Sequence, residues 1–204
     1  MLHTIALAVV LHVSNVAGVA ASALGPAKIE VARLYREIGV DIEWSDDGSR
    51  GGGERPIRVV LLDRETGALR QRSETVMGAA VRTPGGTSAA YVFVRRVESE
   101  AAQFDVPLER VLACAIAHEI GHLLLPDGVT SGHSPDGLMR PCWSRADFHR
   151  AEKRLLRFSA GQAALIRAAI APAPRLATTS DIPGSAETTE SCPPPRRLTA
   201  APCR

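Results

Sequence analysis

Aromatic side chains are scarce in this chain, which has four Phe, two Trp and two Tyr among its 204 residues. Proteins that bind single-stranded nucleic acid stack bases on aromatic rings, so this scarcity argues against such a platform. Charge is also nearly balanced, and a net charge of +2 gives no strongly basic surface. We therefore expect neither nucleic acid nor an anionic membrane surface as a partner.

The chain also lacks an unbroken apolar run that could span a bilayer, because Asn15 interrupts the apolar segment at residues 1–24. Residues 21–23, Ala-Ser-Ala, could be a signal-peptidase site, although no Lys or Arg precedes the apolar run. Alternatively, Thr4–Val13 is rich in Val, Ile and Leu and forms a buried first strand. We favour the strand, so that the chain as given carries no cleavable signal. An extracytoplasmic location stays as the alternative.

The four cysteines have no recognisable metal-binding spacing. Cys114 lies in an apolar stretch and is expected in the core, Cys142 lies further along, and Cys192 and Cys203 lie near the carboxyl terminus. Their even number permits disulfides but does not identify the compartment.

Residues 118–122 read His-Glu-Ile-Gly-His inside an apolar run that predicts a helix. Residues four apart share one helix face, so His118 and His122 can point at one ion. Glu119 projects toward the same cleft and can take a proton from a metal-bound water. Zinc suits this pattern, because it accepts two imidazoles, a third ligand and a water. Two core histidines are the alternative, but these polar groups would then need other partners.

The residues after this motif supply a third candidate ligand. Pro126 and Gly128 are expected to end the helix, and a loop rich in Gly and Ser then returns toward it with His133. Residues 138–141, Leu-Met-Arg-Pro, follow as a tight turn. With these features the sequence resembles the metzincin clan of zinc peptidases, and within it the matrixin-like pattern.

The resemblance implies one catalytic zinc ion and a set of site residues: the ligands His118, His122 and His133, the general base Glu119 and the Met-turn residue Met139. The family pattern places the third His at position 128, whereas His133 comes five positions later (133 − 128). A longer helix or a bulged loop is expected to absorb this difference. Asp136, His149 and Glu152 are alternative third ligands, although basic neighbours of the latter two favour a solvated helix face.

Hydrophobic patterns before and after the motif predict an α+β fold. We expect a helix from Pro26 to Ile38 closed by Gly39, and strands at 40–44, 57–62, 76–81 and 89–94. The motif helix should start near Pro107, and helices at 145–157 and 160–170 should follow, the second capped by Ser159. The resemblance implies an α/β-type upper subdomain with a mixed twisted sheet, an N-terminal helix and an active-site helix, above a small helical C-terminal subdomain.

These elements form one predicted catalytic domain at residues 1–171, with an upper subdomain at about 1–125 and a lower one at about 126–171. From 172 to 204 the chain is rich in Pro, Thr and Ser and cannot bury enough apolar surface to fold. We therefore expect a disordered, Pro-rich tail.

The segment from Val76 to Arg82 resembles the antiparallel edge strand that borders the cleft in this family. Its unpaired backbone groups could hold an extended peptide by β-augmentation. The candidate substrate-binding residues are Met77, Gly78, Ala79, Ala80 and Val81. An ordinary edge strand blunted by Pro84 is the alternative.

We expect a monomeric zinc metalloendopeptidase that hydrolyses a peptide or protein substrate through a metal-activated water, with Glu119 as general base. One alternative is a catalytically inactive zinc-binding or interaction module on the same fold. Another is a small-substrate zinc amidohydrolase. The intact Glu119 argues against the inactive module, because a structural zinc site has no use for that carboxylate.

Overall fold

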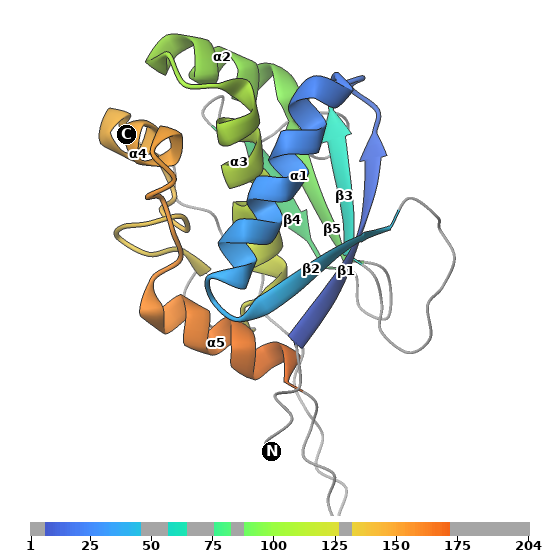
Figure 1. Cartoon of the computed structure of the whole chain (residues 1–204), viewed down its shortest axis with the longest axis vertical. Helices are drawn as coiled ribbons and strands as arrows, with labels where there is room; N and C mark the ends of the chain where they lie inside the picture. Colours follow the sequence, from blue (N-terminus) through green and yellow to red (C-terminus); the bar gives the residue numbers. More distant parts are fainter. Residues whose placement is uncertain (1–6, 46–56, 65–75, 83–87, 127–131, 172–204) are drawn as a thin grey trace, which may run out of the picture.

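A computed structural model describes residues 7–45, 57–64, 76–82, 88–126 and 132–171, and these form a five-stranded mixed sheet and five helices (Figure 1). The strands are β1 (Leu7–Asn15), β2 (Val40–Ser45), β3 (Ile57–Leu62), β4 (Gly78–Val81) and β5 (Ala89–Phe93). The helices are α1 (Ala21–Arg36), α2 (Val94–Phe104), α3 (Leu108–Leu124), α4 (Arg145–Glu152) and α5 (Ala160–Ile170). The predicted α+β class is confirmed, and the predicted tail at 172–204 lies outside the described residues.

The sheet has the strand order β2-β1-β3-β5-β4. The first four strands in this order are parallel, and β4 pairs antiparallel with β5 at the edge. The antiparallel pairing and the edge position of β4 were both expected for the segment from Val76 to Arg82. The predicted first strand is also confirmed over its described residues, because β1 lies between β2 and β3. Residues 21–23, the alternative cleavage site, form the first turn of α1.

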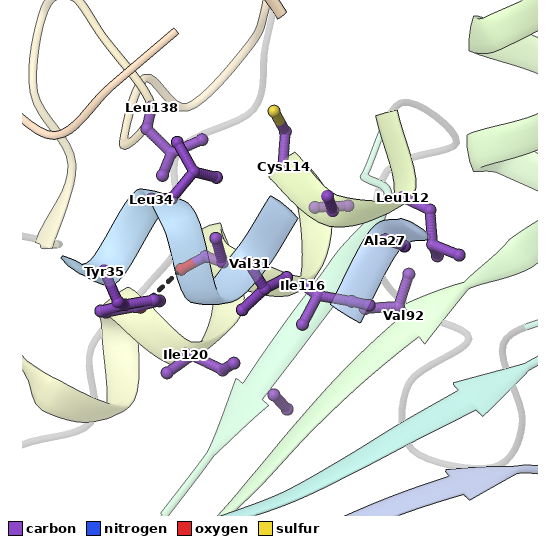
Figure 2. Close-up of a cluster of buried hydrophobic side chains, with 14 of the residues drawn as sticks. Ala27, Val31, Leu34, Tyr35, Val92, Leu112, Cys114, Ile116, Ile120 and Leu138 are labelled. Carbon is purple, nitrogen blue, oxygen red and sulfur yellow. Dashed lines mark hydrogen bonds between the residues drawn. The ribbon is translucent and has the colours of Figure 1, made fainter. Parts of the chain in front are cut away.

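α3 is apolar on nearly all sides because it lies between α1 and the sheet. Figure 2 shows side chains of α1 and α3 pointing toward each other, with Val31 close to Ile116. The hydroxyl of Tyr35, which is fully buried, donates a hydrogen bond to the Ala117 carbonyl at 2.9 Å. This packing holds the motif helix in one position. Cys114, on the same helix, is a buried free thiol, and Cys142 is disulfide-bonded.

Two predicted helix boundaries are wrong. α1 begins at Ala21 rather than Pro26, because burial of Ala27, Val31 and other apolar residues offsets the backbone hydrogen bond that Pro26 lacks. α4 ends at Glu152 rather than at residue 157, because Arg154 has a left-handed φ of 59° that turns the chain.

α2 was not predicted from the sequence, and the predicted strand at 89–94 is one residue too long because this helix begins at Val94. Val94, Val97 and Ala101 are buried at helical spacing among charged residues. α5 was predicted correctly, and the Ser159 side chain caps it by accepting a hydrogen bond from the Gln162 amide. In the described part of the chain, every helix falls short of the length or hydrophobicity needed to cross a membrane.

A buried carboxylate joins α1 to α3 close to Cys114. Glu30 is 4% exposed and accepts hydrogen bonds from Arg33 at 2.6 Å and from Arg110 of α3 at 2.7 Å. Arg154 lies 3.4 Å from the same carboxylate. Burial by itself raises the pKa of Glu30, but the Arg33 hydrogen bond and the three positive charges outweigh it. The pKa therefore lies below its ordinary value of 4.5.

We expect Glu30→Gln to lower the free energy of unfolding at pH 7 by about 2 kcal/mol, because it removes charge-assisted hydrogen bonds. The folded-state pKa is lower than the unfolded one, so this contribution is present above pH 4.5 and is lost as pH falls through the folded value. Urea unfolding at several pH values measures it. Glu98→Gln, at an exposed position, is the control. If the free energies of unfolding of wild type and Glu30→Gln differ by the same amount at pH 7 and at pH 3, the stabilising pairing of Glu30 with the arginines is contradicted.

Candidate metal centre

α3 carries the first two histidines on one face, one helical turn apart. The Nε2 atoms of His118 and His122 lie 3.0 Å from each other. The helix ends soon after, at Leu124, and Pro126 follows within the described residues. Gly128 lies outside them.

His133 comes back to this face of α3, as expected from the sequence. Its Nε2 atom lies 3.1 Å from that of His122. Gly132 permits the approach: its φ is +67°, and a Cβ atom there would lie 2.8 Å from His122 Nδ1. A side chain at position 132 would therefore strain the backbone and collide with the imidazole.

The three imidazoles can hold a metal ion. Their ligand atoms all lie within 4.8 Å of one another. Among the described residues, no other group of three or more His, Cys, Asp or Glu side chains brings its ligand atoms this close together. A tetrahedral zinc site with Zn–N bonds of about 2.0–2.1 Å separates its nitrogen ligands by roughly 3.3 Å. The observed Nε2 separations of 3.0 and 3.1 Å are close to this value.

The alternative third ligands do not join the cluster. His149 Nδ1 lies 3.7 Å from Glu152 on α4, and both side chains are exposed, with relative accessibilities of 49% and 44%. Asp136 is also exposed and lies outside the group. Of the candidates, His133 is therefore the one that meets the other two histidines.

Burial favours the neutral form of His118 and His133, which is the form of an imidazole that binds metal. It lowers the pKa of His118 to about 4, against a smaller opposing effect of the hydrogen bond to the Leu138 carbonyl, and nearby His133 lowers it further. Burial also lowers the pKa of His133. The Leu138 oxygen can only accept, so His118 Nδ1 donates at 2.8 Å and Nε2 keeps its lone pair.

Met139 packs against the motif helix at Gly121. It is fully buried, and a Cβ atom at Gly121 would lie 2.6 Å from its sulfur. The Ser134 amide donates to the Met139 carbonyl at 3.0 Å, which ties the His133 loop to this turn. The glycine of the motif thus lets the turn approach the helix.

Glu119 lies beside β4. Its side chain is 7% exposed, and a Cβ atom at Gly78 would lie 2.6 Å from both Cγ and Oε1 of Glu119. Of the candidate substrate-binding residues, Gly78 is thus in contact with the carboxylate. The Met77 carbonyl accepts from the Phe93 amide at 2.9 Å, and Ala79, Ala80 and Val81 continue along the edge strand.

Arg82 follows β4 and connects it to the end of α3. Its guanidinium donates to the carbonyls of His122 at 3.0 Å and Leu123 at 2.8 Å, and also to that of Leu125. A cation at a helix carboxyl terminus stabilises the exposed carbonyls and the helix dipole. The role of Arg82 was not predicted from the sequence, because no local pattern identifies a contact across 40 residues of chain.

We expect His133→Ala to weaken metal binding by more than the 10- to 100-fold typical of losing a hydrogen-bond partner of a ligand, because a direct ligand is lost. Competition with a chromophoric chelator measures the dissociation constant. His149→Ala removes an imidazole outside the cluster and is the matched control. Equal affinity of His133→Ala and wild type would point to another third ligand.

Comparison with protein-family models and with curated proteins finds no match to this chain, so the site rests on its own geometry.

Proposed function

We propose that this chain is a zinc-dependent metallopeptidase of the metzincin clan, with the fold that the clan resemblance implies. The observation that carries the proposal is the convergence of three imidazoles, one of them next in sequence to the buried Glu119. Three imidazole ligands with a remaining position for water are typical of catalytic zinc, and other divalent ions also bind nitrogen ligands. The adjacent carboxylate favours catalysis over a purely structural role.

A divalent cation bound there would lower the pKa of a coordinated water and polarise a carbonyl group. Glu119 would take a proton from the attacking water as general base and would pass it to the leaving amine. The Nδ1 hydrogen bond of His118 to the Leu138 carbonyl fixes its ring and leaves Nε2 available to bind a cation. Met139 would support the site through its packing against the motif helix at Gly121.

The edge strand supports a peptide as the substrate. β4 lies at the sheet edge, and its Gly78 touches the side chain of Glu119. An extended peptide paired with β4 would therefore run next to the general base. A small-substrate amidohydrolase does not need an edge strand next to the general base, and an inactive module does not need the carboxylate of Glu119.

The test is metal analysis of the purified full-length protein, followed by digestion of an unbiased peptide library with and without a chelator. We expect one zinc per chain and internal cleavages that stop with the chelator and resume when zinc is restored. Zinc binding without any peptide cleavage would refute the peptidase. Hydrolysis of small amides alone would support the amidohydrolase.

A further inference from the structure

The aromatic residue next to the metal centre has no role in the proposed mechanism. Trp143 follows the Met139 turn, and its ring meets that of His118 edge-on, with centroids 5.9 Å apart at 80°. It also packs against Phe148 of α4, which stacks on Phe104 of α2 with centroids 4.4 Å apart. Trp143 therefore connects a candidate ligand to two helices outside the site.

Trp143 and His118 share one hydrogen-bond acceptor. The indole Nε1 donates to the Leu138 carbonyl at 3.1 Å, and His118 Nδ1 donates to the same oxygen at 2.8 Å. A carbonyl oxygen has two lone pairs, so these two donors occupy both. The Leu138 amide is also fixed, because it donates to the Arg157 carbonyl at 2.8 Å.

We infer that Trp143 is a positioning residue for the metal centre, holding the Leu138 carbonyl and the His118 ring in the orientation that binds the ion. The inference rests on the proposed metal site but not on peptidase activity. Groups that orient a ligand in this way typically change metal affinity 10- to 100-fold when they are replaced. Trp143 was not identified from the sequence, because its ring contacts with His118 and Phe148 form only in the folded chain.

Trp143→Phe tests the inference, because it keeps an aromatic ring and removes the indole donor. We expect zinc affinity to fall about 10-fold, with the thermal midpoint of the metal-free protein close to that of wild type. Trp44→Phe is the matched control: Trp44 donates from Nε1 to the Lys28 carbonyl at 3.2 Å, on β2 at the opposite edge of the sheet. Its zinc affinity should equal that of wild type.

Equal zinc affinity of Trp143→Phe and wild type would overturn the inference. If Trp143→Phe does not fold, the tryptophan fluorescence of Trp44→Phe tests the inference instead, because Trp143 is the one tryptophan that this variant keeps. We expect this fluorescence to change as zinc binds. Stoichiometric zinc binding without a change in fluorescence would overturn the inference. If the wild-type protein cleaves no peptide but Trp143→Phe still binds zinc more weakly than wild type, the positioning role of Trp143 is supported and the peptidase proposal is refuted.

Discussion

Replacing Glu119 with Gln is expected to lower kcat by at least about 100-fold while the metal content stays at the wild-type value. Gln has nearly the same volume, so it fits beside Gly78 as Glu does, but it cannot accept a proton. None of the three imidazoles changes. Peptide cleavage assays together with metal analysis of the same samples measure both effects.

The matched control is Glu109→Gln, which makes the same exchange in the first turn of the same helix. We expect this variant to retain wild-type activity. Wild-type turnover in Glu119→Gln would remove Glu119 from the role of general base. Loss of metal in that variant would instead make the carboxylate a part of the ion's binding site.

Gly78→Ala is expected to reduce kcat by about 100-fold, because a displacement of about 1 Å in a catalytic group can have that effect. The added methyl group would lie 2.6 Å from Glu119 Oε1 and 2.7 Å from the Tyr91 carbonyl. β4 cannot move toward β5, because the Tyr91 carbonyl lies there. The Glu119 carboxylate on the other side of the methyl group must therefore move away. Metal content should stay unchanged, because the three atoms nearest to the added methyl group belong to Glu119 and Tyr91 and not to a histidine.

Gly161→Ala provides the control, since a Cβ atom at that position meets nothing within 4 Å. The variant should keep full activity and gain a few tenths to about 1 kcal/mol of stability, because Ala favours a helix over Gly. If Gly78→Ala keeps wild-type kcat, the contact between β4 and Glu119 does not position the general base.

The elements that the sequence predicted well are those with a clear local pattern. The serine cap and apolar spacing identified α5, and alternation with Val- and Ile-rich runs identified β2 and β3. The strand at β4 was expected from the hydrophobic pattern, whereas its antiparallel position at the sheet edge was implied by the family resemblance. α2 was missed although its buried residues follow helical spacing, because the preceding strand continued into it without a break.

The site shows the same division between local and long-range information. The motif placed two histidines and Glu119 together through helix geometry alone, and the His-Ser after the Gly-rich loop indicated His133. Arg82 and Trp143 could not be predicted, because Arg82 binds backbone carbonyls at the end of α3 and Trp143 meets His118 and Phe148 only in the folded chain. The close approaches of Gly78 and Gly132 likewise depend on the packing of separate segments.

Zinc K-edge X-ray absorption spectroscopy of the full-length protein with one equivalent of zinc tests the central claim most directly. The convergence of His118, His122 and His133 predicts three imidazole nitrogens and one oxygen at about 2.0–2.1 Å, with two imidazoles in His133→Ala. A thiolate sulfur at about 2.3 Å, or the same imidazole count in wild type and His133→Ala, would contradict it.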